Sequence, residues 1–135
     1  MSDFDAINPI GWKAPVGYSH GISTPAGRIV VTAGQIGWNP ATCEFESDGF
    51  AAQAAQALRN VAGVLKAAAA TPAHVVRLTW FITDREGYLA ARKEIGEAYR
   101  EIMGRHYPAM SVIVVSALVE GRAKVEIEAT AVVPG

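Results

Sequence analysis

Apolar residues recur at every third or fourth position over two long stretches of the chain. In the first stretch, the apolar stripe consists of Phe50, Ala54, Leu58, Val61 and Leu65. The polar side chains outside this stripe are Gln53, Gln56, Arg59, Asn60 and Lys66. This spacing predicts an amphipathic helix over about 50–69, with Asp48 as its N-cap.

The second stretch covers about 87–103 and has the same period. Its buried side is marked by Tyr88, the aliphatic stem of Arg92, Ile95, Tyr99 and Ile102. Residues 83–86 have the spacing of a capping box, and Gly104 follows the last periodic residue. A second helix is therefore expected between these two signals.

Shorter stretches rich in β-branched and aromatic residues predict five strands. They lie at about 18–24, 28–32, 75–82, 110–117 and 123–133. Turn residues at 25–27 separate the first two strands, which predicts a hairpin. The order ββαβαββ predicts a single α+β domain over residues 1–135, in which both helices pack on one face of one sheet.

The sheet face away from the helices needs cover of its own. The residues that we assign to this face are Val112, Val114, Val125, Ile127 and Ala129. They are too apolar to remain in water, and exposed patches of this kind are uncommon on soluble monomers. We therefore expect the chain to associate with itself.

Composition narrows the function classes. The chain has 135 residues, of which 50% are hydrophobic and 19% charged, as in globular proteins. The net charge is −1 and no basic patch stands out, which argues against nucleic acid as a partner. No apolar run approaches the roughly 20 residues of a membrane span. The acidic start without a signal peptide and the single Cys43 predict a cytoplasmic protein.

Several residues have two interpretations from the sequence alone. Glu126 and Glu128 alternate along the last strand, so both should point to one face, either as solvated carboxylates or as part of a site. Tyr18 either packs beneath a helix or anchors a ligand, and His20 shares its face. Trp38 either caps the core or forms the wall of a cleft. The three histidines show no metal-ligand spacing, so we expect no metal.

Four motifs occur in a fixed order along the chain. They are residues 32–36 (Thr-Ala-Gly-Gln-Ile), 52–58, 107–109 (Tyr-Pro-Ala) and 125–129 (Val-Glu-Ile-Glu-Ala). Together they resemble the RidA/YjgF family over about 18–133. The resemblance implies a chorismate-mutase-like fold and a homotrimer with sites in the clefts between subunits. It also implies hydrolysis of reactive enamines or imines to a keto product and ammonia, without a cofactor.

The same resemblance assigns roles to individual residues. Glu126 matches a glutamate that holds the hydrolytic water, Tyr18 a pocket tyrosine, and Gly34 a glycine whose backbone lines the cleft. Met110 stands where the deaminating branch has an arginine that binds the substrate carboxylate, and Ala33 replaces a serine. These departures imply a branch that lacks the arginine, in which 2-aminomuconate is one assigned substrate.

A substrate carboxylate would still need a cation. Arg105 and Arg122 are the nearest candidates by sequence, with Glu120 as a turn carboxylate at the border of the cleft. Met110 would make the cleft floor apolar. We expect a homotrimeric deaminase of a small molecule, with Glu126 as the base that positions water. The alternative is a non-catalytic trimer that binds small ligands or acts like a chaperone on the same scaffold.

Overall fold

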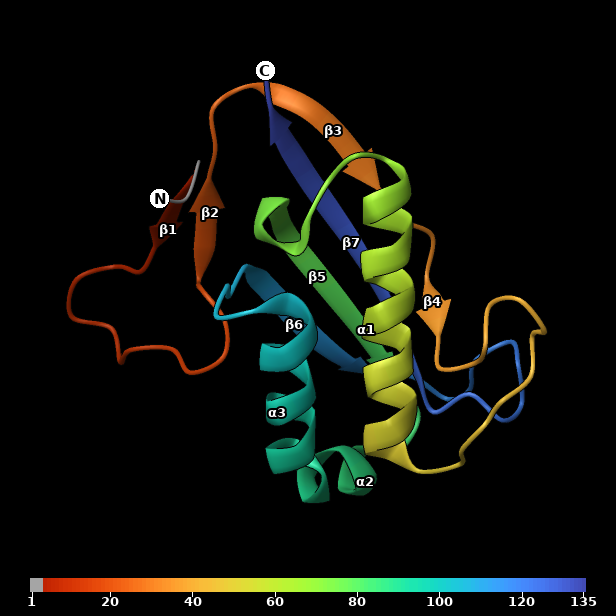
Figure 1. Ribbon diagram of the computed structural model, residues 1–135. Helices are drawn as coiled ribbons and strands as arrows, with labels where there is room; N and C mark the ends of the chain where they lie inside the picture. The colour runs from red at the N-terminus through yellow and green to blue at the C-terminus, as the bar shows by residue number, and fades with distance from the viewer. Residues whose placement is uncertain (1–3) are drawn as a thin grey trace.

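The computed structural model describes residues 4–135, which form a layer of helices against one sheet (Figure 1). The helices α1 (Phe50–Ala67) and α3 (Arg92–Met103) lie side by side on one face of the sheet, with α2 (Arg85–Ala90) at their end. A short 3-10 turn, Pro72–His74, leads into the sheet. The predicted α+β class, with the helices on one face, is confirmed. Within residues 4–135 no helix has both the length and the hydropathy needed to cross a membrane.

The sheet joins segments that are far apart in sequence. Its strands, in spatial order, are β3 (Gly27–Val31), β7 (Val125–Pro134), β5 (Val75–Ile82) and β6 (Ala109–Val114). The two-residue β4 (Gln35–Ile36) also pairs with β7. β5 and β6 run parallel, whereas the other pairs in this sheet are antiparallel. The final strand therefore lies inside the sheet and is bonded on both sides.

The hairpin predicted between 18–24 and 28–32 is wrong. β2 (Gly21–Ser23) pairs with β1 (Asp5–Ile7) in a separate small sheet, whereas β3 pairs with β7. The segment between β2 and β3 contains Pro25 and carries the chain from one sheet to the other (Figure 1). Alternating residues identify a strand but do not select its partner, because any neighbour with a free edge can bond to it.

The second helix is interrupted where a single helix was expected. The carboxylate of Asp84 caps α2 by accepting a hydrogen bond from the Gly87 amide at 2.9 Å. Ala91 ends α2 and begins α3, which turns the short helix so that Tyr88 meets the ring of Phe50 at 6.0 Å. Gly104 terminates α3 at a positive φ of 75°, as its position predicted.

The cap predicted for α1 is also wrong. Gly49 takes the N-cap position without a side-chain hydrogen bond, while the Asp48 carboxylate binds Arg122. Two polar residues of α1, Gln53 and Asn60, are buried rather than exposed. Their amides donate to backbone carbonyls of a neighbouring loop and of β4, which compensates for the loss of water.

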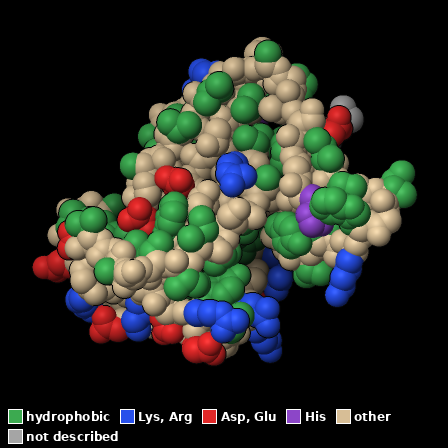
Figure 2. Space-filling model, turned by 180° about the vertical axis from the view of Figure 1, so that it is seen from behind, with side chains coloured by type: hydrophobic (Ala, Val, Ile, Leu, Met, Phe, Trp, Pro, Cys, Tyr) green, Lys and Arg blue, Asp and Glu red, His purple; other side chains and the backbone are tan. Residues whose placement is uncertain are grey.

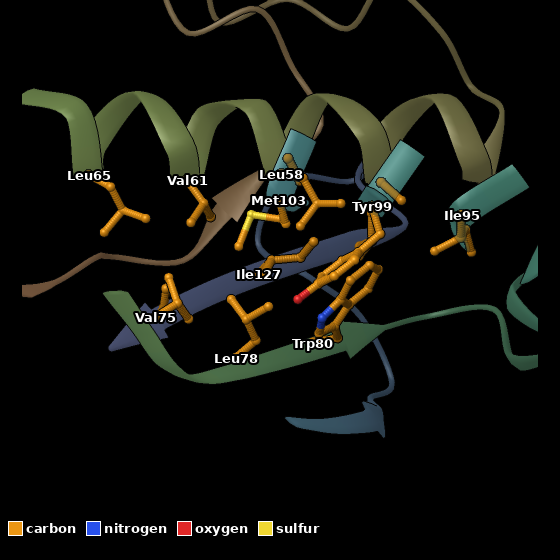
Figure 3. Close-up of a cluster of buried hydrophobic side chains, with 14 of the residues drawn as sticks. Leu58, Val61, Leu65, Val75, Leu78, Trp80, Ile95, Tyr99, Met103 and Ile127 are labelled. Atoms are coloured by element: carbon orange, nitrogen blue, oxygen red, sulfur yellow. The ribbon is translucent and has the colours of Figure 1, made fainter. Parts of the chain in front are cut away.

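The core lies between the helices and the sheet (Figure 3). It contains Leu58, Val61 and Leu65 of α1, Leu78 and Trp80 of β5, Ile95, Tyr99 and Met103 of α3, and Ile127 of β7. Each fully buried leucine, valine or isoleucine stabilises the fold by about 1.5–3 kcal/mol relative to an exposed position. The packing of these buried side chains holds β5 and β7 in fixed register beneath α1.

The assignment of Val125, Ile127 and Ala129 to the uncovered face is wrong. All three belong to the core cluster, so they face the helices. Val112 and Val114, also assigned to the uncovered face, share register with core residues of β5 but remain partly exposed, because β6 is the edge strand. A strand alternates between two faces, and the sequence pattern alone does not say which face meets the helices.

Other apolar residues occupy the open face of the sheet (Figure 2). Ile29 and Val31 of β3 are 70% and 67% exposed, and Ile113 of β6 is 44% exposed. Self-association through this face stays a prediction. It now rests on Ile29, Val31 and Ile113 instead of the residues that the sequence assigned to this face.

Candidate functional site

The residues expected to form one site fall in three places on the single chain. Glu126 lies beside Gly34 on the open face of the sheet. Tyr18 and Met110 line a cavity between α3 and β6. Trp38, Glu120 and Arg122 line a groove formed by two loops. His20 lies next to the ring of Tyr18 in the N-terminal segment.

Glu126 points away from the helices because its strand neighbours Val125 and Ile127 are fully buried against them. It lies opposite Phe81 of β5 on one side and Ile36 of β4 on the other. Within residues 4–135 its half-buried carboxylate forms no hydrogen bond or ion pair with another side chain. The lone pairs are thus free to accept hydrogen bonds from water or from a ligand.

Gly34 is packed directly against this carboxylate. A Cβ atom added at this position would overlap the Glu126 side chain, so the close approach requires glycine. The preceding Thr32 is held to β7, because it exchanges two hydrogen bonds with Ala129 at 2.9 and 3.0 Å. The end of β3 therefore carries the Gly34 backbone to the carboxylate.

The cavity between α3 and β6 has a volume of about 660 Å³. Its lining is Val16, Gly17, Tyr18, Trp80, Tyr88, Arg92, Ile95, Gly96, Tyr99, Arg100, Tyr107, Met110 and Val112. Met110 shares register with the buried Leu78, so it faces the helix side. Met110 and Glu126 consequently lie on opposite faces of the sheet in one chain.

Aromatic rings give the cavity rigid walls. Tyr99 stacks on Tyr107 with ring centroids 5.7 Å apart, and its hydroxyl donates to the His106 carbonyl at 2.6 Å. Burial, together with the neighbouring Tyr107, raises the pKa of Tyr99, which keeps its hydroxyl protonated as a donor. The indole N–H of Trp80 is the one buried side-chain polar atom within residues 4–135 without a hydrogen-bond partner.

Tyr18 and His20 do not lie on a strand, contrary to the prediction. Both are exposed, and their rings meet edge to face at 5.3 Å; Trp12 contacts His20 on the other side at 5.0 Å. The adjacent Ser19 is buried and donates to the Tyr107 carbonyl at 2.6 Å. This bond fixes the Tyr18 backbone beside the Tyr-Pro-Ala motif that opens β6.

The groove lined by Trp38 and Glu120 contains Arg122, but its guanidinium is already engaged. Arg122 donates twice to Asp48, at 3.0 and 2.8 Å, and lies 5.4 Å from the ring centre of Phe45. Trp38 contacts the same Phe45 ring at 5.8 Å. The ion pair reduces the attraction of Arg122 for a substrate carboxylate. Arg105 is exposed and lines neither this groove nor the cavity.

Sequence reasoning missed two kinds of residue. Arg92 and Arg100 line the cavity, and their spacing of eight on one helix face, with Gly96 between them, was the available signal. Asn60 was placed on the polar face of α1, yet its amide donates to the carbonyls of Ile36 and Trp38, each at 3.0 Å. It therefore holds the loop that brings β4 to Glu126.

Within residues 4–135 no three potential metal ligands gather at one point.

Comparisons with known proteins agree with this architecture. The family model described as Endoribonuclease L-PSP matches residues 11–133. The protein DfrA of Myxococcus xanthus is 38% identical over 120 residues, covering 89% of this chain and 88% of that protein. A human 2-iminobutanoate/2-iminopropanoate deaminase is 33% identical over 105 residues, covering 78% and 73% of the two chains.

A solved structure extends the likeness to the whole fold. The Rid-family protein YyfB of Yersinia pestis, whose function is unknown, superposes with a TM-score of 0.86 at 34% identity. The match covers 97% of this chain and 99% of that chain. The chorismate-mutase-like fold implied by the sequence motifs is thereby confirmed. The chain belongs to the RidA/YjgF family, which includes imine deaminases.

Proposed function

We propose that this chain hydrolyses a reactive enamine or imine to a keto product and ammonia, without a cofactor. The observation that carries the proposal is the half-buried Glu126 carboxylate, unpaired by any described side chain and packed against the backbone of Gly34. A carboxylate with free lone pairs beside a backbone turn can hold a water molecule and accept its proton.

The reaction needs only proton transfers and the addition of water. An enamine first takes a proton on carbon, or an imine takes one on nitrogen, and either becomes an iminium ion. Glu126 accepts a proton from water while the water oxygen bonds to the iminium carbon, and it then passes this proton to the nitrogen, which restores the carboxylate. The resulting carbinolamine loses its hydroxyl proton to the carboxylate as the C–N bond breaks. The nitrogen leaves as ammonia, and the water oxygen becomes the carbonyl oxygen.

The complete site is formed between copies of the chain in this proposal. Glu126 and Gly34 lie on the open face, whereas Tyr18 and Met110 lie on the helix side, so one chain does not bring all four to one substrate. A homotrimer that covers the exposed Ile29 and Val31 would place the carboxylate of one copy near the cavity of the next. Tyr18 then anchors the substrate through its hydroxyl.

The substrate class follows from the two departures from the family motif. Met110 supplies an apolar surface where an arginine would bind a carboxylate next to the imine, and Ala33 lacks a hydroxyl. A longer unsaturated substrate such as 2-aminomuconate fits this pattern better than 2-iminopropionate. The same departures favour the second candidate, a trimer that binds a small ligand without turnover.

Ammonia release from 2-aminomuconate and from freshly generated 2-aminoacrylate tests the proposal. The Glu126→Gln variant should lose about 100-fold or more of the rate, because the amide cannot accept the water proton. Glu128→Gln is the matched control, since Glu128 lies two residues away on the same face and is exposed. It should retain the wild-type rate.

Two results would contradict the deaminase proposal. One is a Glu126→Gln variant as fast as Glu128→Gln on either substrate. The other is wild-type protein that is trimeric by light scattering, binds 2-aminomuconate, and releases no ammonia above the uncatalysed rate. That second result would support the non-catalytic trimer.

A further inference from the structure

The two arginines of the cavity lie on the same face of α3. Arg92, Gly96 and Arg100 are spaced four residues apart, which places them on successive turns of the helix. All three line the cavity beside β6. A Cβ atom added at Gly96 would meet Nη1 of Arg100 at 3.3 Å, so the Arg100 guanidinium folds back over Gly96, toward Arg92. The Arg100 guanidinium thus lies over the segment of α3 between the two arginines.

These cations lack a partner in the part of the chain that the structure describes. Within residues 4–135 neither guanidinium forms an ion pair or a hydrogen bond with another residue, and the cavity lining contains no aspartate or glutamate. Seen from behind, basic and acidic side chains alternate next to hydrophobic ones at the lower edge of the molecule (Figure 2), where Figure 1 places α2 and the start of α3, but no acidic side chain lines the cavity itself. The charge of the cavity therefore favours an anion.

The other lining residues indicate the kind of group that the anion carries besides its charge. Tyr18, Tyr88, Tyr99 and Tyr107 provide ring surfaces, and Met110 provides a polarisable floor. Trp80 lies beside Tyr99 between β5 and α3 (Figure 3). A cavity of about 660 Å³ suits a small organic molecule. Planar conjugated groups pack well on aromatic walls, whereas a bare phosphate or sulfate would leave these walls uncovered.

We propose that this cavity binds a planar unsaturated carboxylate, whose acid group is held by Arg92 and Arg100 at the rim. A guanidinium fork matches the two oxygens of a carboxylate and forms charge-assisted hydrogen bonds with them. The inference deepens the proposed function and rests on it for the reacting C=N group. It identifies Arg92 and Arg100, rather than Arg105 or Arg122, as the cations that replace the arginine missing at position 110.

Binding is tested without turnover, using stable probes. Sorbate, a six-carbon dienoate, carries the conjugated body and one carboxylate, and sorbamide is its neutral counterpart. Calorimetry with the full chain should show sorbate binding at least tenfold more tightly than sorbamide. Arg92→Met should weaken sorbate binding about tenfold or more, and Arg92→Lys should weaken it less, because the lysine keeps the charge but loses the fork.

Two further variants test whether the effect on sorbate binding comes from the cavity itself. One removes a positive charge outside the cavity, and the other changes the stability of the helix. Lys93→Met removes one positive charge from the same helix, but residue 93 does not line the cavity, so sorbate affinity should change less than twofold. Gly96→Ala should shift the Arg100 guanidinium only slightly, because an added Cβ would lie 3.3 Å from its Nη1, and should weaken sorbate binding less than Arg92→Met does. Helix propensity should at the same time raise the free energy of unfolding of this variant.

The outcomes distinguish this inference from the proposed function. Equal affinities for sorbate and sorbamide, or no binding at millimolar concentrations, would overturn it. So would an Arg92→Met variant that weakens binding no more than Lys93→Met. Tight binding that depends on Arg92, together with a Glu126→Gln variant of undiminished ammonia release, would uphold the carboxylate site and reject the proposed catalytic base.

Discussion

The two faces of the central sheet carry different chemistry. On the helix side, the residues around the cavity are aromatic, apolar or cationic, and they come largely from α3 and β6. On the open face, Glu126 lies among exposed strand residues next to the Gly34 backbone. In our proposals, one face recognises an anion with an unsaturated body, and the other activates water.

In the proposed mechanism, this division makes one chain an incomplete site for deamination. Core packing forces Val125 and Ile127 toward the helices, which sends Glu126 in the opposite direction. Register with Leu78 sends Met110 to the helix side. Recognition and water activation can meet only if another copy of the chain brings its open face to the cavity.

The largest expected effect tests whether α1 supports the open-face site. Asn60→Ala leaves the buried carbonyl of Ile36 and that of Trp38 without a donor, which should cost about 2–4 kcal/mol of unfolding free energy. Urea denaturation measures the loss, with Arg59→Ala as an exposed neighbour that should cost less than about 0.5 kcal/mol. Equal stability of the two variants would show that α1 does not hold β4 in place.

A smaller effect is expected at the open face itself. Gly34→Ala introduces a Cβ where the Glu126 carboxylate lies, so the side chain must rotate away from the position in which we propose that it binds water. Ammonia release should fall about tenfold, which corresponds to about 1.4 kcal/mol of activation free energy. Gly63→Ala, at a helix position where a Cβ meets nothing, is the control. Full activity of Gly34→Ala would separate the carboxylate from this backbone contact.

The smallest effect concerns the cavity wall and depends on pH. Tyr99→Phe removes the hydrogen bond to the His106 carbonyl and should cost about 1 kcal/mol at neutral pH. Because the folded pKa of Tyr99 is raised, its contribution is complete below the unfolded value near 10 and declines above it. The stability difference between wild type and variant should therefore shrink as the pH rises above 10. A difference that grows with alkalinity would contradict this sign.

Local periodicity was enough to predict α1, β5 and the stop of α3 at Gly104, because these depend on neighbours in sequence. The alternation of Glu126 with its buried neighbours was likewise correct. The break at Ala91 was missed, since no proline or glycine marks it; the turn follows from the packing of Tyr88 on Phe50. The pairing of β2 with β1 was missed because the residues of a strand do not specify which other strand it pairs with.

The candidate site, too, was predictable from the sequence only in part. The motifs around Gly34, Met110 and Glu126 were visible in the sequence as residue types at fixed positions. Their separation onto two faces of the sheet, and the position of Arg92 and Arg100 beside Tyr18 and Met110, arise only when distant segments pack together. Sequence spacing therefore determined which residues share a helix or strand face, whereas burial of the apolar core decided which way each face points. That choice depends on the whole sheet, because every inward residue must find space against α1 and α3 at once.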